Sequence, residues 1–330
     1  MVSIKDVAKL SGVSVTTVSR VMNNRGYIGK ATREKVEDAM RQLNYQPNQI
    51  ARALLKNQSS LLGVIIPDVS HPLFAELVNW IESYASDKNY KLLVCNSLSD
   101  KEKELHYISM LRQNRVDGIV MASHTLDVAS YQDTGMPIVS FDRVLSSNIP
   151  YIASDNYKGG ELATLHLIDR GCKKLLHISG PLEYELLANR RSDAFQLTCI
   201  KNGIEGDCVE GAHIKATFED NWDFIDKNIG IQKLSAYDGV FCSNDIMAYT
   251  LYVYADKHNI NVPEQLKIIG YDYHSFTRML RSPALTTISQ PIDAIGNSLC
   301  STLIELIENP EAGKNKNVIL DVELIQGETT

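Results

Sequence analysis

Two short helical segments separated by a glycine open the chain and constrain its fold more than any other feature. The first 23 residues read MVSIKDVAKLSGVSVTTVSRVMN. Ser3 can cap the first helix, Gly12 can take a positive φ without a Cβ clash, and Ser14 can cap a second helix over 15–23. The residues able to close a small core between the helices are Val7, Ala8, Val13, Val18, Val21 and Met22. This pattern predicts a helix-turn-helix.

The other face of the second helix carries short polar and methyl-bearing side chains followed by a cation. Its residues are Val15, Thr16, Thr17, Ser19, Arg20 and Asn23. The short side chains suit base edges in a major groove, and the Arg20 guanidinium suits a phosphate group. The alternative interpretation is a helical hairpin inside an ordinary core, because this spacing also arises by chance.

The charge distribution favours a nucleic-acid partner. Residues 1–60 contain ten Lys and Arg against four Asp and Glu, a balance of +6, whereas the whole chain has a net charge of −7. A basic end on an acidic body is expected when only that end binds a polyanion.

Bulk composition excludes several other classes. The 330 residues, 44% hydrophobic and 22% charged, are typical of a globular protein with more than one domain. We find no apolar run long enough to span a bilayer and no secretory signal, and we expect a cytoplasmic protein. The six cysteines are scattered, so we predict reduced thiols, no metal site and no cofactor.

A third helix and a short conditional segment follow the pair. Thr32 can cap the helix, whose apolar positions recur at helical spacing, and Pro47 prevents its continuation. The stretch 48–55 has helical spacing but is too short to be stable alone in water. We predict that it folds only on DNA; the alternative is an ordinary linker.

From residue 61 the sequence alternates between apolar strands and helices. The predicted strands are 61–66, 91–95, 118–121, 137–140, 174–178, 237–242 and 266–270, and helices are expected near 73–88, 101–113, 157–170, 188–201 and 244–258. This alternation predicts two doubly wound parallel-sheet lobes with buried strands, and a ligand cleft at the carboxyl ends of the strands.

The chain resembles the lactose/galactose repressor (LacI/GalR) family of bacterial transcription regulators over nearly its whole length. The resemblance is carried in the head by 4–8, 12–14, 17–21, Asn23, 45–48 and 51–54, and in the body by 116–119, 141–143, 154–156, 243–245, 269–272 and 285–290. It implies an all-α helix-turn-helix head, a hinge helix, a core like that of periplasmic sugar-binding proteins, and a homodimer or, in some members, a tetramer. A phosphoprotein co-regulator is left open.

The resemblance also implies boundaries and DNA contacts. The expected parts are a head over 1–47, a hinge over 48–59 and a core over 60–330, with one lobe near 60–157 and 291–320 and the other near 158–290 and 321–330. The expected DNA-binding residues are Val15, Thr16, Thr17, Ser19, Arg20, Asn23, Tyr45, Asn48, Arg52 and Leu54. Leu54 matches the leucine that wedges into the minor groove of a near-palindromic operator.

Polar and aromatic side chains near strand ends are candidates for binding a small sugar. The expected effector contacts are His71, Phe74, Asp142, Arg191, Trp222, Asn244, Asp272 and Gln290, with His124 a weaker candidate. A helix cap or a surface ion pair is the plain alternative for each single Asp or Asn, and core packing is the alternative for Phe74 and Trp222.

Within the family the chain is most similar to repressors of sucrose-utilisation operons, on stretches 95–97, 100–104, 123–124 and 140–143. We therefore expect a repressor controlled by sucrose, fructose or a related sugar. A stand-alone sugar-binding protein would lack the basic head, and an α/β enzyme would show a nucleotide-binding or nucleophile motif that this sequence lacks. The sequence leaves open whether the sugar releases or strengthens DNA binding.

Overall fold

The computed structural model describes residues 2–46, 58–123, 125, 131, 135–182, 186–211, 217–311 and 316–330, and it divides into two compact units, Met1–Ser59 and Ser60–Thr330. The predicted hinge residues Asn48, Arg52 and Leu54, and also His124, lie outside the described residues. Among the helices that are described, none combines the length and the apolar character that crossing a membrane requires.

The head unit consists of α1 (Ile4–Ser11), α2 (Val15–Met22) and α3 (Lys30–Gln42). The turn between α1 and α2 is built as the sequence predicts: Gly12 has φ +69°, and the Thr17 N–H donates to Ser14 Oγ over 3.1 Å. The small core joins Val7, Ala8, Val18 and Val21 to residues of α3, whereas Val13 and Met22 are only partly buried against it.

The predicted cap of the third helix is wrong by three residues. Gly29, not Thr32, caps α3, and the Gly29 carbonyl accepts from the N–H groups of Thr32 and Arg33 over 3.0 and 3.1 Å. Thr32 is therefore already in the first turn of the helix. The prediction failed because a hydroxyl residue is a common cap, but a glycine ahead of it can serve as well.

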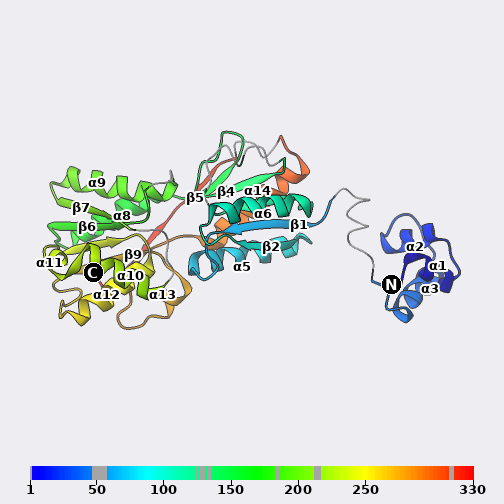
Figure 1. Cartoon of the computed structure of the whole chain (residues 1–330), viewed down its shortest axis with the longest axis horizontal. Helices are drawn as coiled ribbons and strands as arrows, with labels where there is room; N and C mark the ends of the chain where they lie inside the picture. The colour runs from blue at the N-terminus through cyan, green and yellow to red at the C-terminus, as the bar shows by residue number, and fades with distance from the viewer. Residues whose placement is uncertain are drawn as a thin grey trace. The chain divides into compact units, whose positions relative to one another are not determined.

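The first lobe of the core is a six-stranded parallel sheet in the order β11-β5-β4-β3-β1-β2. Its strands are β1 (Leu61–Ile66), β2 (Lys91–Asn96), β3 (Gly118–Met121), β4 (Ile138–Phe141), β5 (Tyr151–Ser154) and β11 (Val318–Leu320). Its helices are α5 (Pro72–Asp87), α6 (Lys101–Gln113) and α14 (Ile292–Glu308). Helices cover both faces of the sheet (Figure 1).

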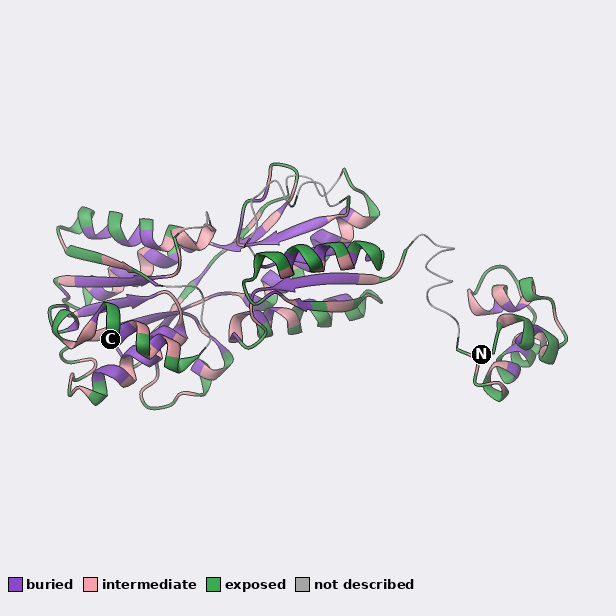
Figure 2. Cartoon of the chain, viewed as in Figure 1, coloured by how far each residue is buried: buried purple, intermediate pink, exposed green. Residues whose placement is uncertain are grey.

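Alternation along β1 explains this layering. Leu62 and Val64 pack with α5 and α14 on one face, while Ile65 packs with α6 on the other. Gly63 also faces α6, where an added Cβ would meet the Leu111 side chain at 2.6 Å. The central strands are buried throughout (Figure 2), as expected for a sheet covered on both faces.

The second lobe is a six-stranded sheet in the order β12-β10-β9-β8-β6-β7. Its strands are β6 (Lys174–Ser179), β7 (Glu205–Glu210), β8 (Gly239–Cys242), β9 (Lys267–Asp272), β10 (Thr286–Ser289) and β12 (Glu323–Ile325). Its helices are α8 (Asn156–Asp169), α9 (Arg190–Asn202), α10 (Phe218–Asn228), α11 (Gly230–Leu234), α12 (Asp245–Lys257) and α13 (Ser275–Met279), with a short 3-10 helix, η1 (Leu187–Asn189), before α9.

Two edge features differ from the predicted buried parallel strands. β2 lies at the edge of its sheet and is mostly exposed or half-buried, because it has a strand neighbour on one side only. β12 pairs antiparallel with β10, since the chain enters the second lobe directly from β11 without the crossover that a parallel partner needs. The fold class predicted from the sequence is otherwise confirmed.

The chain passes between the lobes three times. It crosses from β5 to α8, from β10 to α14 and from β11 to β12, and few residues separate the elements at each crossing (Figure 1). Three short crossings side by side are the arrangement expected where two lobes can rotate relative to each other about a cleft.

Candidate effector-binding cleft and DNA-binding head

A cavity of about 150 Å³ lies between the two lobes at the carboxyl ends of the parallel strands. Seven of the eight predicted effector residues line it: His71, Phe74, Asp142, Arg191, Asn244, Asp272 and Gln290. This is the edge at which doubly wound folds bind ligands, because the loops that follow neighbouring strands meet there.

Trp222, the eighth predicted residue, does not line this cavity, and its prediction as an effector contact is corrected. It sits one turn into α10, packs against Tyr254 and His258, and lines a separate groove on the second lobe. Its ring faces α12 because α10 and α12 pack together there. The structure therefore matches the alternative interpretation, in which Trp222 is a packing residue.

Asp142 of the first lobe is joined to Arg191 of the second through Asn156 by a chain of polar contacts beside the cavity. Asn156 Nδ2 donates to Asp142 Oδ1 over 2.7 Å, and Arg191 Nε donates to Asn156 Oδ1 over 2.7 Å. The Arg191 guanidinium also donates to the Ser243 carbonyl and lies 3.5 Å from the centroid of the Tyr271 ring. Burial raises the pKa of Asp142 to about 6, against the opposing influence of Arg191.

Asp272 ends β9 and has two side-chain partners at the cavity. It accepts from Gln290 Nε2 over 2.5 Å and forms an ion pair with His274 over 2.9 Å. Burial opposes charge on both groups, yet their mutual attraction lowers the pKa of Asp272 and raises that of His274. Its φ of +109° is uncommon for a side-chain-bearing residue and is held in place by these contacts.

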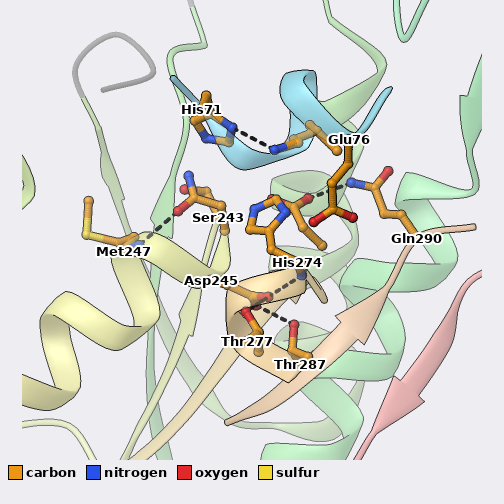
Figure 3. Close-up of polar contacts among 12 residues, drawn as sticks. His71, Glu76, Ser243, Asp245, Met247, His274, Thr277, Thr287 and Gln290 are labelled. Carbon is orange, nitrogen blue, oxygen red and sulfur yellow. Dashed lines mark hydrogen bonds and ion pairs between the residues drawn. The ribbon is translucent and has the colours of Figure 1, made fainter. Parts of the chain in front are cut away.

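Gln290 joins the lobes at the second crossing. Its Oε1 accepts from Ser154 Oγ of the first lobe over 2.6 Å, while its Nε2 binds Asp272 of the second lobe. Figure 3 shows His274 between Glu76 and Asp245. The fully buried Asp245 in turn accepts from Thr277 and Thr287 over 2.7 and 2.5 Å.

His71 and Asn244 act as helix caps as well as cavity residues. His71 Nδ1 accepts from the Leu73 N–H over 3.3 Å at the start of α5, and Asn244 Oδ1 accepts from the Met247 N–H over 2.8 Å at the start of α12. The capping role offered as the alternative for Asn244 is therefore present, and it leaves the amide nitrogen for other contacts. Burial lowers the pKa of His71 to about 4.

The cavity also contains polar residues that the sequence did not single out. Among them are Ser123, Thr125, His177 and Ser192. Ser192 follows Arg191 directly in α9, so the predicted role of Arg191 could have pointed to Ser192 as a cavity residue. Ser123 lies in the stretch 123–124 that carries the resemblance to sucrose operon repressors. Thr125 and His177 gave no signal, because a lone Thr or His near a strand carries no motif.

The candidate DNA-binding residues of the head lie mainly on the outer face of α2. Val15, Thr16 and Arg20 are exposed, and the half-buried residues are Thr17, Ser19, Asn23 and Tyr45. Tyr45 packs partly against the head core. An outer face of this composition can meet base edges and phosphates.

Two family models match this chain, one in the head unit and one in the core unit. The family model "Bacterial regulatory proteins, lacI family" matches residues 3–48, and a periplasmic binding protein-like domain matches 164–330. The sucrose operon repressor of Pediococcus pentosaceus is 41% identical, with 99% of this chain and 98% of the relative covered.

Two solved structures show the same architecture. The lac repressor dimer bound to operator and the anti-inducer ONPF has a TM-score of 0.86 and 26% identity, covering 100% of this chain and 99% of that one. A periplasmic binding protein/LacI transcriptional regulator from Alkaliphilus metalliredigens, complexed with D-xylulofuranose, has a TM-score of 0.73 and 33% identity, covering 82% and 99%.

A helix-turn-helix head on a two-lobed binding core defines the class of ligand-controlled transcription regulators. The chain belongs to the LacI family of bacterial regulatory proteins. The predicted class of DNA-binding regulator is thereby confirmed, and the interpretations as a stand-alone binding protein or an α/β enzyme are wrong.

Proposed function

We propose that this protein represses a carbohydrate-utilisation operon and is controlled by a small sugar, sucrose or fructose or a related one, bound between the lobes of its core. The observation that carries the proposal is the convergence of Asp142, Arg191, Asn244 and Asp272 on one interlobe cavity. Carboxylate, guanidinium and amide groups are the partners that sugar hydroxyls need, and Phe74 adds an apolar surface for the ring.

The DNA side of the proposal rests on the head. Val15 and Thr16 read bases, Arg20 and the other cations of residues 1–60 bind phosphates, and the hinge at 48–59 folds in the minor groove with Leu54 as its wedge. Two copies related by a twofold axis bind a pseudo-palindromic operator. A protein that binds operator DNA in a bacterium acts in the cytoplasm, where that DNA lies.

Coupling between the two ends passes through the crossings. A ligand that holds Asp272 and Asp142 together fixes the angle between the lobes, and in a dimer this angle sets the spacing of the paired hinges. A coupling of about 1–3 kcal/mol would change operator affinity between about fivefold and 150-fold.

The test is operator binding by the purified protein, titrated with a panel of sugars and sugar phosphates. At least one of these compounds should change the operator affinity several-fold in either direction and be recovered chemically unchanged. Operator binding that ignores every sugar would contradict the effector part of the proposal, while the DNA part would stand.

A further inference from the structure

A buried glutamate fixes the direction of two hydroxyl groups on the first-lobe wall of the cavity. Ser123 Oγ and Thr125 Oγ1 both line the cavity and both donate to Glu104 Oε2, over 2.6 and 2.7 Å. Glu104 comes from α6, is fully buried and also accepts from the Tyr131 hydroxyl. Because each hydroxyl has one hydrogen, only lone pairs remain on Ser123 and Thr125. Ser123 is fully buried and its Oγ also lies 2.7 Å from Ser97 Oγ, whereas the half-buried Thr125 turns its lone pairs towards the cavity.

A buried histidine does the same on the second-lobe wall. His177 Nδ1 lies 2.9 Å from the Phe241 carbonyl oxygen, which can only accept, so Nδ1 carries the proton. Burial lowers the pKa of His177 to about 4, and its Nε2 is therefore an acceptor. The Ser192 hydroxyl, 3.0 Å away, donates to this nitrogen and also presents lone pairs to the cavity.

A buried donor without a partner also lies in the cavity wall. His71 lines the cavity with only 2% of its surface exposed, and its Nδ1 already accepts from the helix it caps. The neutral ring then carries its proton on Nε2, which has no hydrogen-bond partner among the described residues. An unpaired buried donor of this kind costs stability until a ligand oxygen accepts from it.

The cavity has no surplus of positive charge that would attract an anionic ligand. Among its described lining residues Arg191 is the one cation, and it faces the carboxylates of Asp142 and Asp272. Arg191 is already engaged by Asn156 and the Ser243 carbonyl. A phosphate dianion would therefore meet acceptors and carboxylates rather than a surplus of positive charge.

Building on the proposed function, we propose that the effector is a neutral polyhydroxylated sugar rather than a sugar phosphate, and that Glu104 and His177 are positioning residues that orient the hydroxyls of Thr125 and Ser192 to receive its hydroxyl protons. A sugar hydroxyl donates one hydrogen bond and accepts others, so it can satisfy His71 Nε2 and an oriented serine together. A phosphate oxygen can only accept and satisfies His71 alone.

Calorimetric titration of the full-length protein tests the ligand class. The probes are D-fructose and sucrose, each compared with its 6-phosphate. We expect the neutral member of a pair to bind at least about tenfold more tightly. Tighter binding of a phosphate would overturn the inference and leave the proposed function intact, while binding of none of the four would overturn the inference and count against the proposed function too.

Glu104→Gln tests the positioning role. Its amide end can donate to Thr125 and so turn the hydroxyl proton of Thr125 into the cavity. We expect a loss of about tenfold in affinity for the parent sugar, but almost no loss for the monodeoxy analogue that lacks the matching hydroxyl. Glu102→Gln, an exposed change on the same helix, is the matched control and should alter neither affinity.

His177→Phe is the second variant, because it keeps the ring stacked on Phe241 and removes the acceptor of Ser192. It should also lose affinity for the parent sugar but not for one monodeoxy analogue, which lacks a different hydroxyl from the analogue that matches Glu104→Gln. Circular dichroism and operator binding check that the variant is folded. Equal losses for the parent sugar and every monodeoxy analogue in both variants would show a purely structural role and overturn the assignment.

Discussion

Glu76 and Arg278 form an ion pair that bridges the two lobes of the core. Glu76 lies on α5 of the first lobe, and its Oε2 is 3.2 Å from Arg278 Nη2 on α13 of the second. Its other oxygen accepts from the Ser275 N–H over 2.6 Å. One carboxylate thus binds the second lobe twice, close to His274 (Figure 3), which forms the ion pair with Asp272.

We predict that Glu76→Ala weakens effector binding about two- to fivefold, because the bridge favours the arrangement in which both cavity walls meet the ligand. The effect is modest since half of the Arg278 side chain is exposed and water screens the pair. Calorimetry with the sugar identified by the panel measures it. Glu82→Ala, an exposed change on the same helix, is the control; if it produces the same loss, the bridge has no specific role.

Effector affinity should depend on the protonation of Asp142. Burial places its pKa near 6, and a sugar hydroxyl that donates to the carboxylate favours the charged form. Affinity should therefore be constant above pH 6 and fall as the pH decreases below it, approaching about tenfold per unit. His71 and His177, with pKa values of about 4, remain neutral over pH 5–8.

Asp142→Asn provides the comparison for this pH profile. Asp245 also has a pKa of about 6, but it is not among the cavity-lining residues. Asp142→Asn removes the titrating carboxylate that lines the cavity and leaves Asp245 unchanged. The variant should bind weakly at pH 7 and show a flat profile between pH 5 and 7. A wild-type profile that is equally flat would contradict the role given to the carboxylate.

Leu54→Ala should lower affinity for operator DNA far more than affinity for unrelated duplexes. An apolar wedge contributes only where the duplex is unstacked and bent, which costs about a few kcal/mol and occurs only at a specific site. Fluorescence anisotropy with both duplexes at one salt concentration measures the two losses. Losses of equal size would refute the wedge.

Val18→Ala should destabilise the head by about 2 kcal/mol, because the side chain is fully buried in its small core. Thermal unfolding followed by circular dichroism measures the change. Val15→Ala removes the same atoms from the outer face of α2, where 40% of the residue is exposed, and should leave the unfolding midpoint nearly unchanged. A midpoint that shifts equally in both variants would mean that the two faces are assigned incorrectly.

The sequence predicted much of the cavity because a polar residue at the end of a parallel strand, or directly after it, can only emerge at one edge of the sheet. Asp142 and Asp272 follow this rule, and Gln290 follows β10 in the same way. The rule fails for Trp222, whose position in a helix decides which way it faces and whose neighbours in α12 lie far along the chain.

Glu104 shows a different limit. It belongs to the charged run Asp100-Lys101-Glu102-Lys103-Glu104, which by composition belongs on a solvated helix surface. The structure buries it completely, because Ser123, Thr125 and Tyr131 supply the hydrogen bonds that a carboxylate needs away from water. Those partners lie 19–27 residues further along the chain, and nothing in local spacing connects them to the glutamate.

The central claim is that a sugar bound between the lobes controls a DNA-binding head. Its most direct test is the affinity of the full-length protein for a pseudo-palindromic duplex, selected by the protein from a random pool, at increasing salt and with or without D-fructose or sucrose. The account predicts binding that weakens steeply with salt and changes at least about fivefold with one of the sugars. Binding to no duplex, or an affinity that neither sugar alters, would contradict it.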